Sequence, residues 1–258
     1  MRSMICILFA TMIATFLHVS IEVFAQLGAN SACDRIRFVT RQAWGAVEPT
    51  AAVYQARQAA SRVFVHQAWD GQTCNDVDSC IVRVRSIQAY NQQQKGWPDI
   101  GYNFLIAGNG GVFEGLGWMK QGFHTLNYND ESLGVAFIGT FHDSAPNARM
   151  EQAFRDLIEC SVARGYLVAN HAIHGHRDAR CTICPGDALY ARLRTFPRFQ
   201  PGPLPRYSCP SSGLTSGALN QHQAAPIAIF GNISSSALHN NHRSQIIFNV
   251  TASIAPKQ

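Results

Sequence analysis

The stretch SLGVAFIGTF, residues 132–141, is a near-continuous apolar run. Such a run is typical of a central strand in a sheet that is covered on both faces. The segments RVFVHQ at 62–67 and NFLIAGNGGVFEG at 103–115 are rich in β-branched and aromatic residues. The second segment contains Asn109-Gly110-Gly111, which is typical of a hairpin turn. We therefore predict a sheet whose buried central strand lies at 132–141.

Three segments with apolar residues at helical spacing are interleaved with these strands. They are CIVRVRSIQAYNQQQKG at 80–96, MEQAFRDLIECSVARGY at 150–166 and GDALYARLRTF at 186–196. Helices that alternate with strands indicate an α/β fold. We expect a single domain with a central mixed β-sheet flanked by helices.

The N-terminal residues 1–25 have the composition of a signal peptide. Arg2 precedes a long apolar run, and Val23-Phe24-Ala25 forms a small-residue cleavage pattern ahead of Gln26. An uncleaved anchor is the alternative, since the apolar run is long enough for one. No later segment approaches the roughly 20 apolar residues of a membrane helix. We therefore expect a secreted, extracellular protein without stable membrane insertion.

The sequence changes character after the third helical segment. The stretch QPGPLPRYSCPSSG at 200–213 cannot continue a helix or a strand, and the residues that follow are mostly polar. Sequons at Asn232 and Asn249 could carry glycans in a secreted chain. We expect the domain to span 33–200, and 201–258 to form a proline-rich linker and a disordered tail.

The overall composition is that of a globular protein with a mild positive charge. The 258 residues are 47% hydrophobic and carry a formal net charge of +5, so a wholly disordered chain is excluded. The basic residues form no runs of the kind that follow a nucleic-acid backbone, and we expect no nucleic-acid partner. An acidic polymer would suit this surface, although the charge alone does not select one.

The cysteines include one that needs a role outside a disulfide. Of eight cysteines, Cys6 lies in the predicted signal peptide, which leaves seven. In an oxidising compartment an odd number leaves at least one cysteine without an internal partner. Cys181 and Cys184 form a C-x-x-C inside HAIHGHRDARCTICPGD at 171–187, which also contains three histidines. This stretch could be a metal site, a redox pair or a small disulfide loop.

A metal site would combine this stretch with an upstream histidine. His66, His176 and Cys184 supply the nitrogen and thiolate ligands that zinc prefers, and three ligands leave one tetrahedral position open for catalysis. A structural zinc knuckle and a redox pair remain alternatives on spacing alone. We expect surface or core roles for His171 and His174, because a fourth protein ligand would close the open position.

Four ordered blocks of the sequence resemble a known family. They are FVHQ at 64–67, GWPDIGYNFLIAGNGGVFEGLGW at 96–118, NYNDESLGVAFIGTF at 127–141 and GHRDARCTICPG at 175–186. Together they resemble the peptidoglycan recognition proteins, which are related to the phage-type zinc amidases that cleave N-acetylmuramoyl-L-alanine bonds. The resemblance runs from about residue 38 to about residue 199 and implies the amidase fold.

The resemblance implies one Zn²⁺ ion held by His66, His176 and Cys184. It also places Tyr102 and Thr182 in catalytic positions, where both would make polar contacts with the reacting groups. Family members that only bind peptidoglycan commonly replace the cysteine, often with serine. Because Cys184 is present, we expect a zinc-dependent N-acetylmuramoyl-L-alanine amidase of innate immunity. The alternative is a non-catalytic peptidoglycan receptor of the same fold.

The resemblance also implies a groove that binds bacterial peptidoglycan or muropeptides. Gly96-Trp97 matches a dipeptide associated with diaminopimelate-type stem peptides, whereas Leu116 replaces the family arginine that pairs with the extra carboxylate. The stem-peptide preference therefore stays open, as does the oligomeric state. For Trp118, packing into the domain is as good an interpretation as stacking on a sugar. The expected substrate-binding residues are Gly96, Trp97, Trp118, His124, Thr125 and Asn129.

Two disulfides follow from the resemblance, and a third from elimination. The family bridges fall on Cys74–Cys80 and Cys33–Cys160. Cys181 and Cys209 are then the remaining pair, and Cys184 is left for the metal.

Overall fold

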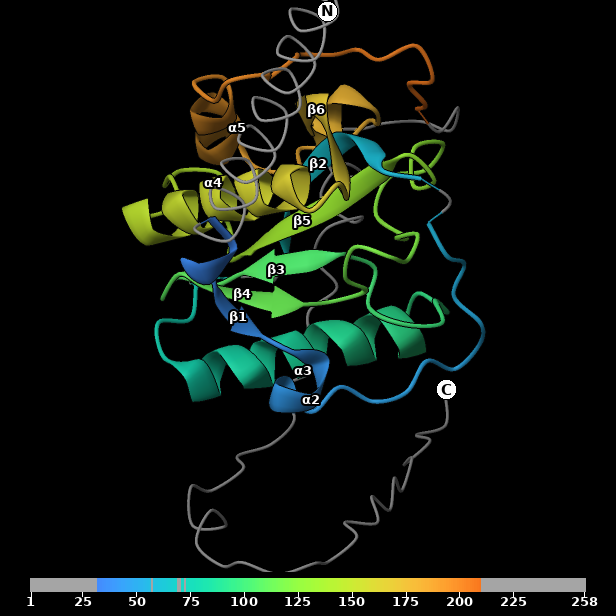
Figure 1. The fold of residues 1–258 in the computed structure, drawn as a ribbon, viewed down its shortest axis with the longest axis vertical. Coiled ribbons are helices and arrows are strands. Elements are labelled where there is room, and N and C mark those ends of the chain that lie inside the picture. Colours follow the sequence, from blue (N-terminus) through green and yellow to red (C-terminus); the bar gives the residue numbers. More distant parts are fainter. Residues whose placement is uncertain (1–31, 57, 69–70, 72, 210–258) are drawn as a thin grey trace, which may run out of the picture. The chain divides into compact units, whose positions relative to one another are not determined.

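A computed structural model describes residues 32–56, 58–68, 71 and 73–209 of the chain (Figure 1). The predicted signal peptide and the tail after Cys209 lie outside the described residues. The elements are, in chain order, β1 (Arg37–Val39), α2 (Arg41–Trp44), β2 (Ala60–Ala68), α3 (Val77–Gln93), β3 (Phe104–Ile106), β4 (Gly111–Glu114), β5 (Ser132–Ile138), α4 (Ala148–Ala163), β6 (Leu167–Gly175), the 3₁₀ turn η1 (His176–Asp178) and α5 (Asp187–Leu193).

The strands form one mixed sheet in the order β1-β4-β3-β5-β2-β6. All neighbouring strands run parallel except the hairpin of β3 and β4. Every residue of β5 is buried, as expected for a central strand covered on both faces. The predicted fold class, a mixed sheet flanked by helices, is confirmed.

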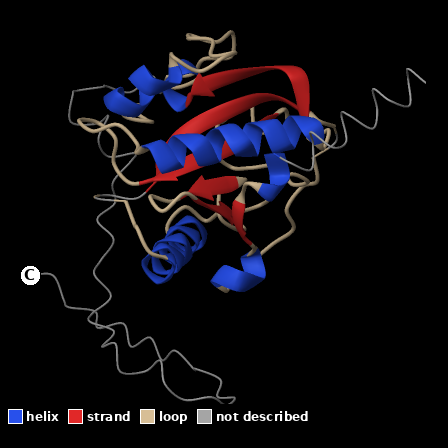
Figure 2. Cartoon of the chain, turned by 60° about the vertical axis from the view of Figure 1, so that its left-hand side comes forward, coloured by secondary structure: helices blue, strands red, loops and turns tan. Residues whose placement is uncertain are grey.

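The two faces of the sheet are covered by different helices (Figures 1 and 2). Met150, Phe154 and Leu157 of α4 pack with α5 against one face. Residues of α2 and α3 pack against the opposite face. Along β2, Val65 belongs to the core under α4, and His66 points to the other face because side chains alternate along a strand. The sheet thus directs His66 away from α4.

Strands β1 and β6 have no counterpart among the predicted strands. The three residues of β1 are not fully buried, so they show no core pattern. In β6, Ala169 and Asn170 are exposed and interrupt the apolar residues on either side. Pairing with β4 and β2, rather than local pattern, makes these segments strands.

The two long helices begin at capping residues. The Asp76 side chain accepts a hydrogen bond from Ser79 N at 2.8 Å, and α3 begins at Val77, three residues before the predicted start at Cys80. The Asn147 side chain accepts from Met150 N at 3.0 Å in the same way. These polar caps, rather than the apolar spacing, set where the helices start.

The proline-rich segment after residue 200 belongs to the packed domain as far as Cys209. Gly202 N donates to the Asp178 side chain at 2.7 Å, and Leu204 N donates to Asp178 O at 2.8 Å. Ser208 N donates to Ala179 O at 3.1 Å. The boundary expected at 200 is therefore too early, because proline excludes regular helix and strand but not packing through backbone hydrogen bonds.

The structure contains the three expected disulfides, and Cys184 stands outside them as a buried residue. Because Cys181 pairs with Cys209, the C-x-x-C does not form a disulfide loop of its own. Each bridge stabilises the fold by roughly 2 to 4 kcal/mol, mainly by constraining the unfolded chain. The bridges are Cys33–Cys160, Cys74–Cys80 and Cys181–Cys209.

Within the described residues, no helix combines the length and apolar character needed to cross a bilayer.

Glu151 of α4 holds α5 through Arg192, and we predict a pH-dependent stability contribution from this pair. Arg192 Nε and Nη2 each lie 2.7 Å from a Glu151 carboxylate oxygen, and these hydrogen bonds hold the pKa of Glu151 below its usual range. A lowered folded-state pKa stabilises the protein at neutral pH, and this stability is lost as the pH falls through that pKa. Glu151→Gln should lower the free energy of unfolding by about 1 kcal/mol at neutral pH.

Urea denaturation at neutral and acidic pH checks this prediction. The difference between wild type and Glu151→Gln should shrink at acidic pH, and an unchanged difference would contradict the proposed cause. Glu159→Gln is the matched control, since Glu159 pairs with Arg35 but its side chain is 60% exposed. We expect the control to cost less than about 0.5 kcal/mol.

Candidate metal centre

Two parallel strands bring His66 and His176 together. In the pairing of β2 with β6, Val65 lies opposite Gly175. The next residue along the first segment is His66, and the next along the second is His176. His66 lies near the carboxyl end of β2 and His176 directly follows β6, so both lie at the same end of the sheet, because parallel strands share a direction. Their ring centroids are 4.5 Å apart.

Cys184 enters the site from the loop that follows η1. Gln67 N donates to its Sγ at 3.4 Å, and the same sulfur lies 3.8 Å from His66 Nδ1. The ligand atoms of His66, His176 and Cys184 all lie within 4.8 Å of one another. Zinc bonds of about 2.0 to 2.3 Å imply ligand separations of about 3.3 to 3.8 Å, so the set needs only a small contraction to hold the ion.

The electrostatic environment also suits a metal. Burial lowers the pKa of His176 to about 3, with a further contribution from the charge of Arg180. Burial, together with His176 and His124, lowers the pKa of His66 well below its usual value. Both imidazoles are then neutral at physiological pH, which is the form that binds metals. His176 Nε2 is buried without a hydrogen-bond partner among the described residues, as expected of a ligand atom.

Tyr102 and Thr182 border this group of ligands. The Tyr102 ring centroid is 5.3 Å from that of His66. Burial raises the pKa of Tyr102, and the negative charge of a Cys184 thiolate raises it further, so the phenol keeps its proton. Thr182 Oγ1 accepts a hydrogen bond from Cys184 N at 3.2 Å. The structure thus brings both predicted catalytic residues to the three candidate ligands.

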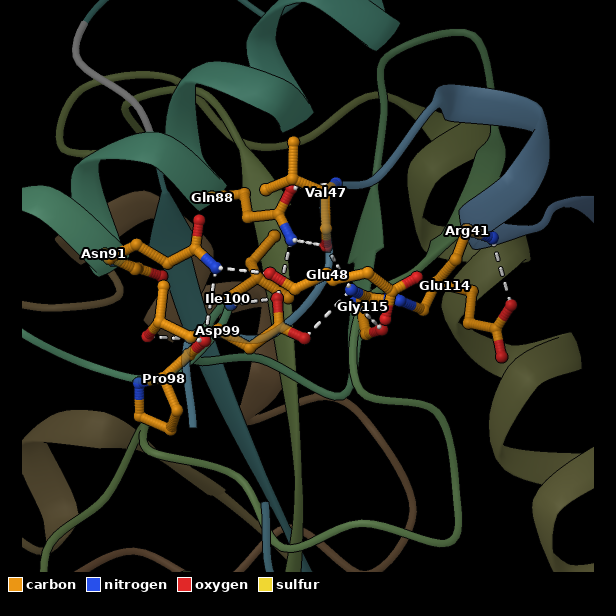
Figure 3. Close-up of polar contacts among 12 residues, drawn as sticks. Arg41, Val47, Glu48, Gln88, Asn91, Pro98, Asp99, Ile100, Glu114 and Gly115 are labelled. Atoms are coloured by element: carbon orange, nitrogen blue, oxygen red, sulfur yellow. Dashed lines mark hydrogen bonds and ion pairs between the residues drawn. The ribbon is translucent and has the colours of Figure 1, made fainter. Parts of the chain in front are cut away.

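A buried carboxylate fixes the segment that leads to Tyr102 (Figure 3). Asp99 is fully buried, and its Oδ1 accepts from Gln88 Nε2 at 2.7 Å. Its Oδ2 forms an ion pair with Arg41 Nη2 at 2.9 Å. Two residues further on, Gly101 N donates to the Asn91 side chain at 2.8 Å. Helices α2 and α3 thereby fix the backbone on the N-terminal side of Tyr102.

A second buried carboxylate fixes His176. Asp178 Oδ2 accepts from Gly175 N at 2.7 Å, and its Oδ1 accepts from the Tyr190 hydroxyl at 2.6 Å and from Gly202 N. The predicted site residues do not include Asp178. Its signal in the sequence is its place in GHRD, two residues after the predicted ligand.

The loop that carries His124 lies against His66. The two ring centroids are 5.2 Å apart. Asn129 Oδ1 accepts from His124 N at 3.0 Å and from Thr125 N at 2.7 Å, so Asn129 shapes this loop. Thr125 is 0% exposed, and its Oγ1 lies 3.3 Å from His66 Nε2. Thr125 is thus enclosed in this structure, and its contact with substrate stays a prediction.

Gly96 and Trp97 lie between α3 and the Tyr102 segment. Gly96 has a φ of 66°, a left-handed conformation that glycine adopts without strain. The Trp97 ring stacks on Phe123 with centroids 6.2 Å apart. A Cβ on Gly101 would approach the Trp97 ring to 2.4 Å, so glycine is what allows this indole to lie beside the Tyr102 segment.

Trp118 is placed away from the candidate ligands. Its ring lies 4.7 Å from Phe104 and 5.1 Å from Tyr166, and its Nε1 donates to Ser161 Oγ at 2.8 Å. Phe104 belongs to the core beneath α4, on the face opposite His66, and Trp118 packs against that core. These contacts favour the packed interpretation of Trp118, and its role as a groove residue stays a prediction.

His171 and His174 make contacts with the backbone of the domain rather than with the candidate ligands. His171 Nδ1 lies 2.9 Å from Val168 O, and His174 Nδ1 lies 2.7 Å from Gln200 O. His174 Nε2 lies 2.9 Å from Arg62 Nη1. Neither histidine belongs to the ligand group, in agreement with the expectation for both.

Gly134 of β5 provides the surface on which the His124 ring lies, and we predict that a methyl group there displaces the ring. A Cβ at Gly134 would come within 2.2 Å of His124 Cδ2. Gly134→Ala should lower the free energy of unfolding by about 1 to 3 kcal/mol through overpacking. Urea denaturation measures this cost.

A double-mutant cycle with His124→Ala identifies the cause. Once the ring is removed, Gly134→Ala should cost much less than in wild type, because the two changes share one contact. Additive costs would show that the His124 ring is not what Gly134 accommodates.

Residues 55–187 match the family described as N-acetylmuramoyl-L-alanine amidase. The chain is 42% identical to mouse (Mus musculus) peptidoglycan recognition protein 4 over 171 residues, which are 66% of this chain and 44% of that protein. It is 37% identical to mouse peptidoglycan recognition protein 1 over 179 residues, which are 69% of this chain and 96% of that protein. The match thus spans less than half of the first relative and nearly all of the second.

Solved structures give the same result. Drosophila peptidoglycan recognition protein SD superimposes with a TM-score of 0.63 at 34% identity, over 66% of this chain and all of that chain. A human peptidoglycan recognition protein crystallised with glycosamyl muramyl pentapeptide superimposes with a TM-score of 0.61 at 39% identity, over 64% of this chain and 98% of that one. The chain belongs to the peptidoglycan recognition protein family and contains an N-acetylmuramoyl-L-alanine amidase family domain.

Proposed function

We propose that this chain is a secreted, zinc-dependent N-acetylmuramoyl-L-alanine amidase of innate immunity. It binds bacterial peptidoglycan and hydrolyses the amide between the lactyl group of N-acetylmuramic acid and the L-alanine of the stem peptide. The observation that carries the proposal is the cluster of His66, His176 and Cys184, whose ligand atoms lie within 4.8 Å of one another. A serine in place of Cys184 would offer a hydroxyl, a much poorer zinc ligand than a thiolate.

The residues around the cluster have complementary roles in this reaction. Zinc, when bound, supplies Lewis-acid chemistry that acidifies water and polarises an amide carbonyl. Tyr102 keeps its proton because burial raises its pKa, so its hydroxyl can donate to the oxygen on which negative charge develops. Thr182 is held next to Cys184 by the hydrogen bond from Cys184 N and adds a second polar group. Preorganised donors of this kind stabilise the transition state without moving during the reaction.

Solved relatives support peptidoglycan as the partner. Members of the family have been crystallised with a muramyl pentapeptide and with tracheal cytotoxin, a monomeric diaminopimelic acid-type peptidoglycan. In this chain Trp97 and His124 lie near Tyr102 and His66 and would border the bound glycopeptide. Leu116 carries no charge, and its side chain is 4% exposed in the core. It therefore cannot pair with a diaminopimelate carboxylate. The stem-peptide preference therefore depends on other groups.

Secretion is supported by the cysteines. Three disulfides in one domain are typical of proteins that fold in an oxidising compartment. The segment proposed to direct secretion, residues 1–25, is cleaved before Gln26 in this proposal.

The proposal predicts that hydrolysis depends on zinc and on Cys184. Purified protein should release stem peptides from peptidoglycan, and Cys184→Ser or a chelator should abolish the release, with zinc restoring activity only to the chelated wild type. Chromatography of the released peptides measures the reaction. If the protein binds peptidoglycan of several wall types but releases no stem peptide from any of them, the amidase proposal is rejected and the receptor alternative is supported.

The matched control removes cysteines that are not candidate ligands. The double variant Cys181→Ala/Cys209→Ala loses one disulfide and should be less stable by roughly 2 to 4 kcal/mol. We expect its hydrolysis rate at room temperature to stay within about threefold of wild type, because the three ligands are intact. If the C-x-x-C were a redox centre, this variant would be as inactive as Cys184→Ser.

A second prediction concerns Tyr102. Tyr102→Phe should lower kcat by about a hundredfold with a smaller change in KM, because the lost hydrogen bond acts mainly in the transition state. Tyr54→Phe, at a tyrosine that is 73% exposed, is the control and should be unchanged. Steady-state kinetics on a soluble muropeptide make the measurement. If kcat/KM fell by the same factor through a higher KM with kcat unchanged, Tyr102 would instead be assigned to substrate binding.

A further inference from the structure

The Thr125 hydroxyl lies between two histidines of the site. Thr125 Oγ1 is 3.3 Å from His66 Nε2 and 3.0 Å from His124 Nδ1. The side chain has no exposed surface. Asn129 fixes its backbone, because Asn129 Oδ1 accepts from Thr125 N at 2.7 Å. Thr125 is therefore a buried, rigidly held link between His66 and His124.

A single hydroxyl between two imidazoles restricts where their protons lie. A neutral imidazole has one N–H and one unprotonated nitrogen, and a hydroxyl donates one proton and accepts others. If His66 Nε2–H donates to Thr125 Oγ1, the hydroxyl acts as the acceptor from His66, and it still has a second lone pair and its own proton for the contact with His124 Nδ1. His66 Nδ1 is then unprotonated. The opposite direction would place the His66 proton on Nδ1.

The candidate ligands distinguish these two directions. His66 Nδ1 is the nitrogen that faces Cys184 Sγ, at 3.8 Å. Only an unprotonated nitrogen can bind a metal at that position. The direction in which His66 donates to Thr125 leaves the nitrogen available, and the opposite direction blocks it.

We propose that Thr125 is a positioning residue that fixes His66 in the Nε2–H tautomer, with Nδ1 free for the metal. This inference rests on the proposed zinc site. It assigns the buried Thr125 hydroxyl a role through His66. Hydrogen-bond partners of metal-binding histidines fix the tautomer and orient the ring, and their loss weakens metal binding by about 10- to 100-fold.

The variants Thr125→Val and Thr125→Ser separate the hydroxyl from the shape of the side chain. Valine keeps the branched shape and removes the hydroxyl, whereas serine keeps the hydroxyl. Zinc affinity is measured on the whole protein by competition with a chromophoric chelator. We expect Thr125→Val to weaken zinc binding by about 10- to 100-fold and Thr125→Ser to stay within about threefold of wild type. A folded Thr125→Val protein with wild-type zinc affinity would overturn the proposal.

The tautomers can be measured without any variant. Long-range ¹H–¹⁵N correlation spectra of metal-free wild-type protein distinguish Nε2–H from Nδ1–H imidazoles. We expect Nε2–H for His66. An Nδ1–H signal for His66 would overturn the proposal even if Thr125→Val failed to fold.

The two proposals fail in different ways. If wild-type protein releases no stem peptide but Thr125→Val still weakens zinc binding, the amidase is rejected and the positioning role is kept. A working amidase whose zinc affinity is unchanged in folded Thr125→Val keeps the amidase and rejects the positioning role.

Discussion

The parallel pairing of β2 with β6 is the constraint on which the candidate site depends. Its register places His66 and His176 side by side, although 110 positions of the chain separate them. A shift of one residue would turn His66 into the core beneath α4, because side chains alternate along a strand. The apolar residues next to His66, which are buried under α4, therefore fix the register and with it the site.

Buried polar groups then fix the loops around this pair of strands. Asp99 holds the segment before Tyr102 against α2 and α3, and Asp178 holds η1 against α5 and the segment at 202. A buried carboxylate is unfavourable unless hydrogen bonds and charges compensate it, and both carboxylates have several such partners. The same geometry that satisfies them positions Tyr102 and His176. Fold stability and site geometry therefore rest on the same contacts.

Local pattern predicted most of the fold but not its edges. The apolar run of β5 and the helical spacing of α4 are strong signals because burial on both faces or on one stripe leaves a clear period. The short strand β1 and the interrupted strand β6 carry no such signal. The segment at 201–209 was expected to be a linker from its prolines, yet backbone hydrogen bonds and the Cys181–Cys209 bridge attach it to the domain.

The sequence by itself determined the fold class and the family, because motif blocks and apolar periods are local properties of the chain. It also supplied the residues that could bind a metal. Only the tertiary structure decided how they are used: it brought His66 to Cys184, placed Trp118 beneath α4, and enclosed Thr125 between two histidines. These outcomes depend on strand register and burial, which are set by contacts between residues far apart in the chain.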